Sequence, residues 1–163
     1  MVLKTSVRKM DIEIASDVGQ GPGADLPRLD QQLCFALYST VNRVTRLYRP
    51  VLAALGLTYP QYLAMLALWE RSPRSVKDIG ESLRHEPATL SPLLKRLEAL
   101  GYVTRARSRS DERQLIVELT DKGRALRAEA EKIPYRVVET LGMEVAELEA
   151  LHAALGRVIA ATA

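Results

Sequence analysis

The sequence of 163 residues contains a single cysteine, Cys34, and only two histidines, His85 and His152. One cysteine excludes an intramolecular disulfide and every metal site built on cysteine pairs. Neither histidine lies in a cluster with the spacing of metal ligands, and neither has the sequence partners of a histidine-based catalytic triad. We therefore expect no metal and no cofactor.

Long apolar stretches are also absent. No run approaches the roughly 18 residues of a membrane-spanning helix, and the N-terminus lacks the continuous apolar segment of a signal peptide. Hydrophobic residues make up 47% of the chain and charged residues 26%, a composition typical of globular proteins. The sequence predicts a cytoplasmic protein with no membrane partner.

Positive charge is concentrated in one segment, although the formal net charge is only +3. Residues 71–113 contain ten basic and six acidic side chains, so the rest of the chain is slightly negative. Most charge runs are solvated surfaces, but these basic residues cluster on one predicted helix and one hairpin. A localised basic face is the electrostatic footprint of nucleic-acid binding, and we favour DNA as the partner.

The segment 84–100 predicts a helix with two unlike faces. Its apolar face has the spacing of helical turns and consists of Leu90, Leu93, Leu94, Leu97 and Leu100. The opposite face is small, hydroxylated and basic, which suits a recognition helix in the DNA major groove. That face comprises Ala88, Ser91, Pro92 and Lys95, with Thr89 and Arg96 at its edge. Pro92 fits only near the start of a helix, so the sequence leaves open a start at Pro87 or nearer Ser91.

A short helix before this segment and a hairpin after it complete the pattern. Ser75 and Asp78 resemble a capping box, and the helix that they start would form a helix-turn-helix with the recognition helix. After Gly101, residues 102–107 and 114–119 have the composition of β-strands. Arginines on such a hairpin can enter a minor groove or clamp phosphates, and this one carries Arg105, Arg107, Arg109 and Arg113.

Helical patterns flank the helix-turn-helix on both sides. Residues 29–55 have apolar side chains at spacings of three and four, and Tyr59 and Pro60 open a second apolar helix. Thr120 is placed to cap one helix, predicted to continue to about residue 133, and residues 144–161 form a last helix that is apolar on one side. Terminal helices of this kind need a partner surface, on their own domain or on a second copy.

The predicted fold is mainly α with a small β-wing: a winged helix-turn-helix that dimerises through its N- and C-terminal helices. Residues 1–28 lack periodicity and have the composition of a flexible linker, whereas residues 29–163 form a single domain. Within it, residues 29–58 and 120–163 are assigned to dimerisation and residues 59–119 to DNA binding.

Over residues 29–159 the chain resembles the MarR family of winged-helix repressors. The resemblance lies in the run TLSPLLKRLEALGYVTR, in Asp111-x-Arg113 of the wing, and in the run LTDKG that begins at Leu119. It implies that Asp111 and Arg113 support the hairpin and its contact with double-stranded DNA. It also implies that the protein binds a pseudo-palindromic operator as a homodimer.

A narrower resemblance, over residues 29–70, is to the organic hydroperoxide resistance regulators called OhrR. In those proteins a cysteine near the start of the first helix senses peroxide, and two tyrosines of the other subunit bond to it. The match assigns Cys34 to sensing, and Tyr48 and Tyr59 to bonding. Cys34 and Tyr48 are 14 residues apart, about 21 Å along a continuous helix, so an antiparallel partner would bring them together.

The chemistry of these residue types agrees with the resemblance. A thiolate is the nucleophile toward peroxide oxygen, and a helix N-terminus and phenolic donors both favour a thiolate. The product, a sulfenic acid, no longer fits the thiolate's hydrogen bonds. Some family members resolve the sulfenate with a second cysteine, which this chain lacks. The resemblance thus implies the one-cysteine type, whose full response needs a low-molecular-weight thiol or further oxidation.

Three other interpretations remain. A lone cysteine on an apolar helix is usually an inert core residue, and a MarR-type repressor with such a cysteine would be released by a small aromatic or phenolic ligand. A thiol peroxidase also needs one activated cysteine, but the sequence offers neither an obvious arginine on the Cys34 face nor a resolving cysteine, so we predict no enzyme. A structural DNA-bridging protein would respond to neither oxidant nor ligand.

Overall fold

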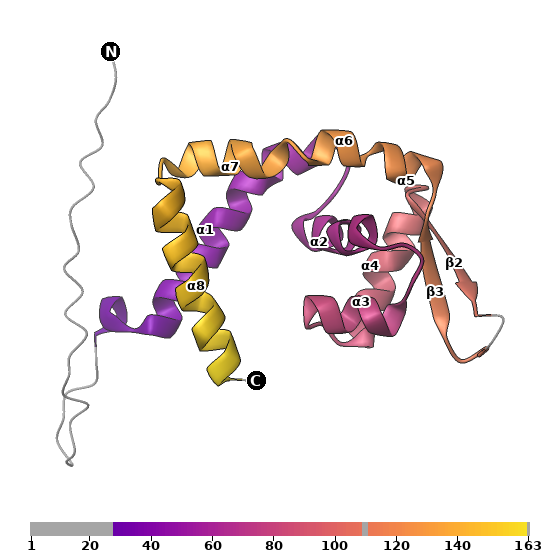
Figure 1. The fold of residues 1–163 in the computed structure, drawn as a ribbon, viewed down its shortest axis with the longest axis horizontal. Coiled ribbons are helices and arrows are strands. Elements are labelled where there is room, and N and C mark those ends of the chain that lie inside the picture. The colour runs from indigo at the N-terminus through magenta and orange to yellow at the C-terminus, as the bar shows by residue number, and fades with distance from the viewer. Residues whose placement is uncertain (1–27, 109–110, 163) are drawn as a thin grey trace. The chain divides into compact units, whose positions relative to one another are not determined.

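The computed structural model describes residues 28–108 and 111–162, except for the side chain of Pro87. The chain divides into two compact units, residues 1–43 and residues 44–163, and each is described by itself. The described part of the first unit contains the 3₁₀-helix η1 (Leu29–Gln31) and the beginning of α1 (Leu33–Ala53) (Figure 1). Almost all of the predicted N-terminal extension, and Arg109 of the wing, lie outside the described residues.

The second unit contains the predicted helix-turn-helix (Figure 1). It is made by α2 (Tyr59–Glu70), α3 (Val76–Leu83) and α4 (Pro87–Ala99). Burying a leucine of α4 contributes about 1.5–3 kcal/mol relative to exposing it. The side chains of α4 that are fully buried in the core are Leu90, Leu94 and Leu97, which pack with Met65, Leu68 and Ile79. The predicted apolar face of the recognition helix is confirmed.

The starts of α3 and α4 follow from local sequence. The Ser75 hydroxyl oxygen accepts a hydrogen bond from the Asp78 N–H at 3.0 Å, and Asp78 Oδ2 accepts one from the Ser75 N–H at 3.3 Å. This is the predicted capping box. Helix α4 begins at Pro87 and contains Pro92 in its interior, so the earlier of the two possible starts is the observed one.

Helix α4 ends at Ala99, and Gly101, two residues later, has a φ of +75°. The N–H of Gly101 donates to the Glu98 carbonyl at 2.8 Å and the N–H of Tyr102 to the Leu97 carbonyl at 3.0 Å, the two hydrogen bonds of a Schellman motif. Directly after this stop, the Tyr102 hydroxyl donates to the carbonyl of Leu55 at 2.8 Å. The start of the wing is thereby attached to the turn that follows α1.

The wing belongs to a three-stranded antiparallel sheet, one strand more than predicted. Strands β2 (Val103–Arg107) and β3 (Leu115–Leu119) form the predicted hairpin, with Arg105 opposite Val117. Strand β1 (Arg74–Ser75) pairs with the other edge of β3, which gives the order β1-β3-β2. The sequence did not reveal β1, because two residues are too few to show the alternation of a strand.

The C-terminal part consists of four helices, α5 (Asp121–Ala125), α6 (Arg127–Ala130), α7 (Ile133–Leu141) and α8 (Val145–Ala161). The prediction of one continuous helix from Thr120 to about residue 133 was wrong. At Leu126 and Lys132, between the segments, the ψ angles are −23° and −17°. These are less negative than the value of about −42° in a regular α-helix, so the α pattern is interrupted there. Pro134 lies in the first turn of α7, where proline is tolerated.

Helices α1 and α8 bury little of their apolar surface within the described chain. Only Leu52 is buried in α1, which continues through Pro50, and no residue is buried in α8. Their large exposed apolar side chains include Leu33, Tyr38, Val41, Val145, Leu151 and Ile159. Among the described residues, no helix combines the length and apolarity needed to cross a membrane.

Candidate DNA interface and sensor site

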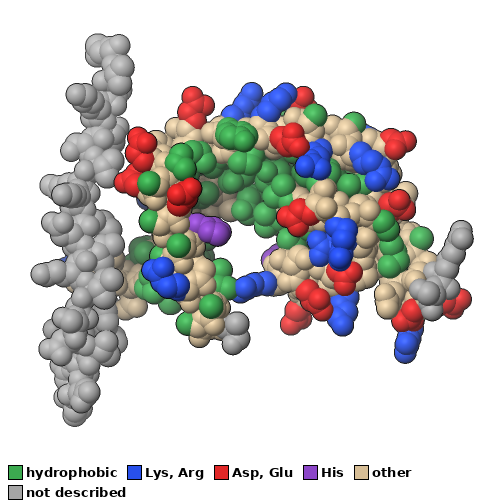
Figure 2. Space-filling model, in the orientation of Figure 1, with side chains coloured by type: hydrophobic (Ala, Val, Ile, Leu, Met, Phe, Trp, Pro, Cys, Tyr) green, Lys and Arg blue, Asp and Glu red, His purple; other side chains and the backbone are tan. Residues whose placement is uncertain are grey.

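The outward face of α4 presents the side chains that were predicted to contact DNA. Ser91 is half-buried, and the exposed members of this face are Ala88, Thr89, Pro92, Lys95 and Arg96. Lys95 and Arg96 form no ion pair with any residue in the described ranges. Figure 2 shows basic and acidic side chains interspersed on this face of the molecule.

At the tip of the wing, the Asp111 carboxylate organises the loop. Its Oδ1 accepts hydrogen bonds from the backbone N–H and the Nε of Arg113, both at 3.1 Å, and its Oδ2 accepts one from Gln114 Nε2 at 3.2 Å. The bonds from Arg113, followed by the bond from Gln114, lower the pKa of the Asp111 carboxyl. The Arg113 side chain stays 92% exposed, so the pair fixes the loop and still presents a cation to solvent.

The other described arginines of the hairpin have different surroundings. Arg107 is exposed, and its Nη1 donates to the carbonyl of Glu112 at 2.8 Å. Arg105 is turned onto the protein: its side chain is only 16% exposed and forms an ion pair with Glu98 of α4. Arg107 and Arg113 are therefore the exposed candidates for DNA contact, whereas Arg105 is bonded to Glu98.

The run from Leu119 to Gly123 joins the wing to α5. The Thr120 hydroxyl accepts a hydrogen bond from the Gly123 N–H at 3.0 Å and donates one to the Gly101 carbonyl at 2.7 Å. Gly123 has no space for a side chain, because a Cβ atom there would lie 2.0 Å from the carbonyl oxygen of Tyr102. Part of the sequence motif is thus explained by packing.

Cys34 is the second residue of α1, and its side chain is exposed. Within the protomer it is therefore not a core residue. The described ranges contain no group of three or more His, Cys, Asp or Glu side chains able to hold a metal.

Tyr48 of α1 and Tyr59 of α2, which were predicted to act together, lie side by side. Their ring centroids are 4.8 Å apart, and the Tyr62 ring lies 6.0 Å from Tyr48 and 6.5 Å from Tyr59. Sequence reasoning missed the participation of Tyr62, although its position three residues after Tyr59 places both on one side of α2.

The environment of the three tyrosines keeps their hydroxyls protonated. Burial raises the pKa of Tyr48, Tyr59 and Tyr62, and the proximity of the rings raises those of Tyr48 and Tyr62 further. No residue in the described part of the chain forms a hydrogen bond with the hydroxyl of Tyr48 or Tyr59. Two neutral phenols are consequently available as donors to an anion.

We expect a spectroscopic titration of the folded protein to show phenols that ionise above the ordinary pKa of 10.0. Because these pKa values are raised in the folded state, the stability that they contribute is complete below pH 10 and is lost as the pH rises further. Tyr48→Phe should diminish the late absorbance change at 295 nm. Tyr135→Phe, at a residue that is 78% exposed, should leave that late change intact, and equal effects of the two substitutions would contradict the assignment.

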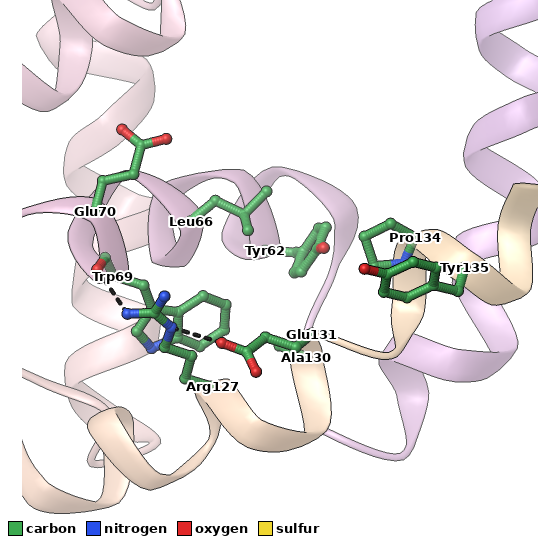
Figure 3. Close-up of a pocket in the computed structure, with 9 residues that line it drawn as sticks. All are labelled: Tyr62, Leu66, Trp69, Glu70, Arg127, Ala130, Glu131, Pro134 and Tyr135. Carbon is green, nitrogen blue, oxygen red and sulfur yellow. Dashed lines mark hydrogen bonds and ion pairs between the residues drawn. The ribbon is translucent and has the colours of Figure 1, made fainter. Parts of the chain in front are cut away.

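A pocket of about 450 Å³ adjoins the aromatic group (Figure 3). It is lined by residues of α2 and of the segment from α6 to α7, namely Tyr62, Leu66, Trp69, Glu70, Arg127, Ala130, Glu131, Pro134 and Tyr135. The Arg127 guanidinium is held in place, because its Nε donates to Glu131 Oε1 at 2.9 Å and its Nη1 to the Trp69 carbonyl at 3.4 Å. Two carboxylates, those of Glu70 and Glu131, offset this cation, so the aromatic walls suit a flat, uncharged organic ligand.

A recognition helix with an exposed polar face and a β-hairpin wing define a winged helix-turn-helix regulator. The family described as transcriptional regulator SarA/Rot matches residues 46–130. The chain belongs to this SarA/Rot group of MarR-type winged-helix transcriptional regulators.

Two relatives and one set of solved structures support this membership. The chain is 52% identical over 130 residues to the HTH-type transcriptional regulator TtmR of Methylorubrum extorquens (strain PA1), which covers 79% of this chain and 67% of the relative. It is 42% identical over 131 residues to the organic hydroperoxide resistance transcriptional regulator of Bacillus subtilis (strain 168). The matched region covers 80% of this chain and 89% of the relative.

The solved structures that match this chain include those of AbfR of Staphylococcus epidermidis. Reduced AbfR bound to DNA superimposes with a TM-score of 0.70 at 35% identity, covering 83% of this chain and 94% of AbfR. Overoxidised AbfR bound to DNA superimposes with a TM-score of 0.64 at 37% identity, covering 80% and 96%. The predicted fold class and the resemblance to MarR-type and OhrR regulators are confirmed.

Proposed function

We propose that the protein is a transcriptional repressor that senses organic hydroperoxides by oxidation of Cys34 and then releases its operator. The observation that carries this proposal is the pair of neutral phenols, Tyr48 and Tyr59, whose ring centroids are 4.8 Å apart and whose hydroxyls have no partner among the described residues. The exposed thiol at the start of α1 and the 42% identity to a hydroperoxide resistance regulator support it. Since the relatives are transcriptional regulators, we propose no enzymatic activity.

The proposed sensor is assembled by a homodimer. Cys34 and Tyr48 belong to one helix, α1, and residues far apart along a straight helix cannot meet within one chain. An antiparallel second copy places the tyrosines of one protomer at the cysteine of the other. The exposed apolar side chains of α1 and α8 provide an interface for this contact. A two-fold dimer also matches the two half-sites of a pseudo-palindromic operator.

In the proposed reaction the Cys34 thiolate attacks one oxygen of the hydroperoxide. The O–O bond breaks, the alkoxide leaves and takes up a proton as an alcohol, and the sulfur becomes a sulfenic acid, oxidised by two electrons. A low-molecular-weight thiol then condenses with the sulfenic acid, forming a mixed disulfide and water. The structure of overoxidised AbfR bound to DNA supports the mixed disulfide, rather than overoxidation, as the form that releases DNA.

The proposed release starts at the tyrosines. Loss of the negative sulfur removes the acceptor of two charge-assisted hydrogen bonds, which are the strong ones. Tyr59 and Tyr62 lie on α2, and α2 packs against both α3 and α4. A displacement of α2 therefore moves the recognition helix with respect to its half-site.

The test is a titration of operator binding, measured by fluorescence anisotropy on the DNA upstream of the protein's own gene. Cumene hydroperoxide together with cysteine as the small thiol is expected to release the DNA, and cumene hydroperoxide alone to release it incompletely. Retention of DNA under both conditions would contradict hydroperoxide sensing. Absence of binding by the reduced protein to any upstream fragment would contradict the repressor assignment itself.

Lys95→Ala and Arg113→Ala are each expected to weaken operator binding by roughly tenfold, since a good side-chain contact to DNA contributes about 1–3 kcal/mol. Loss of a phosphate contact should lower the slope of affinity against salt concentration by about one, whereas loss of a base contact should relax specificity at one position. Lys132→Ala, at an exposed lysine paired with Glu129, is the control. Wild-type affinity in both variants would refute the docking of α4 and the wing.

A specific observation also favours a second candidate function, a repressor released by a small aromatic ligand. The 450 Å³ pocket beside Tyr62 and Trp69 has aromatic walls and the cation of Arg127, and it lies on α2, the same helix that contacts α4. In this case a flat, uncharged phenol would release the operator from wild type and from Cys34→Ser equally. Filling the pocket with Leu66→Trp would abolish that response.

A further inference from the structure

A carboxylate of the recognition helix and an arginine of the wing are joined by three hydrogen bonds. Arg105 Nε donates to Glu98 Oε2 at 2.9 Å, and Arg105 Nη2 donates to the same oxygen at 2.6 Å. The second carboxylate oxygen, Oε1, accepts the backbone N–H of Arg105 at 3.1 Å. One carboxylate therefore holds both the side chain and the backbone of a single wing residue.

The pair bridges the short segment of chain that joins α4 to the wing. Glu98 lies in the last turn of α4, the chain turns at Gly101, and Arg105 occupies the middle of β2. The Arg105 side chain is 16% exposed and that of Glu98 is 38% exposed. A partly buried, charge-assisted pair with several hydrogen bonds is more directional than an ordinary surface ion pair.

The two arginines further along the hairpin differ from Arg105 in this respect. Arg113 is 92% exposed, and Arg107 is exposed and bonded only to a backbone carbonyl among the described residues. The Nε and Nη2 of Arg105 donate to Glu98 rather than to solvent. This arginine is therefore held against α4, whereas Arg107 and Arg113 are presented to solvent.

We propose that Arg105 is a positioning residue, which together with Glu98 sets the orientation of the wing relative to the recognition helix. This inference rests on the proposed DNA binding. The protein can place Lys95 of α4 and Arg113 of the wing on one duplex at the same time only if that orientation is fixed. Glu98, although negatively charged, thus contributes favourably to DNA binding.

The sign of the Glu98→Ala effect separates a positioning role from a DNA contact. If Arg105 positions the wing, Glu98→Ala and Arg105→Ala each weaken operator binding by about tenfold. The double variant then binds no more weakly than either single variant, because both substitutions remove the same interaction. The salt slope then stays at the wild-type value. If Arg105 contacts a phosphate, Arg105→Ala lowers the salt slope by about one, and Glu98→Ala tightens binding, because it frees the arginine and removes a negative charge.

Glu112→Ala is the matched control for the loss of one negative charge. Glu112 is an exposed wing residue whose side chain forms no ion pair with the described residues, so this variant should bind as wild type or slightly more tightly. Arg105→Lys keeps the charge but cannot reproduce the paired N–H donors of the guanidinium group. Its operator affinity should therefore be close to that of Arg105→Ala. Far-UV circular dichroism and thermal unfolding establish that each variant is folded.

The outcomes also separate this inference from the proposed function. A wild-type protein that binds its operator, together with a folded Glu98→Ala variant that binds as well or better, overturns the positioning role alone. A lowered salt slope in Arg105→Ala, with rescue by Arg105→Lys, overturns it as well and restores Arg105 to direct contact. A wild-type protein that binds no operator overturns the repressor assignment and this inference together.

Discussion

Cys34→Ser is expected to keep its operator at concentrations of organic hydroperoxide and thiol that release the wild-type protein completely. A serine hydroxyl is not a nucleophile toward peroxide at neutral pH and cannot form a mixed disulfide, so the response should disappear. The unoxidised variant should still bind its operator, because the serine hydroxyl adds no bulk at this position and can accept hydrogen bonds from Tyr48 and Tyr59 in place of the thiolate.

Intact-protein mass spectrometry shows whether the loss of response has the expected chemical cause. Wild type should gain the mass of one bound thiol per protomer as DNA is released, and Cys34→Ser should gain none. Tyr48→Phe should still be oxidised but respond less, because it keeps the nucleophile and loses a hydrogen-bond donor. Release of both wild type and Cys34→Ser would make Cys34 a structural residue, and release of neither would redirect attention to the aromatic pocket.

Gly123→Ala is expected to destabilise the winged helix-turn-helix severely. The added Cβ atom would lie 2.0 Å from the Tyr102 carbonyl oxygen and 3.2 Å from a methyl group of Leu119. The backbone oxygen cannot rotate away, so α5 must move. Gly123 also donates to the Thr120 cap at 3.0 Å and accepts a hydrogen bond from Trp69 Nε1 at 2.8 Å, and both bonds would be strained.

The expected loss for Gly123→Ala is on the order of 3 kcal/mol or more, from overpacking, a weakened cap and a weakened, partly buried hydrogen bond from Trp69. That corresponds to a fall in melting temperature of roughly 10 °C. Gly101→Ala is the matched control: its Cβ would meet only Lys122 Cδ at 3.9 Å, and the cost is the strain of a φ of +75°, about 1–2 kcal/mol. Equal melting temperatures for the two variants would refute the close contact at Gly123.

The parts of the fold that could be predicted are those with a local signal. The leucines of α4 recur at helical spacing, Ser75 and Thr120 are caps with recognisable partners, and Gly101 stops a helix. Strand β1 could not be predicted, because Arg74 and Ser75 form a strand only through pairing with β3. The interruptions at Leu126 and Lys132 also have no sequence mark, since both residues are compatible with a continuous helix.

The residues of the candidate sites also fall into those that the sequence could predict and those that it could not. The exposed face of α4 follows from helical periodicity, and the pairing of Tyr48 with Tyr59 came from the resemblance to OhrR. The participation of Tyr62 and the capture of Arg105 by Glu98 depend on how separate elements pack. Sequence gives the charge of an arginine but does not give the direction of its guanidinium, and this is why Arg105 was grouped with the exposed arginines of the wing.

The hydrogen bond from Tyr102 to Leu55 connects the base of the wing to the turn that follows α1, the helix that carries Cys34. Coupling between two binding events is reciprocal. Under the proposed mechanism the mixed disulfide weakens operator binding by a certain factor. Operator binding must then disfavour formation of the mixed disulfide by the same factor. Protein free of DNA is then modified first. Where one pool of repressor occupies several operators, the weakest operators are vacated at the lowest oxidant level and the strongest last, so the genes respond in an order set by their DNA.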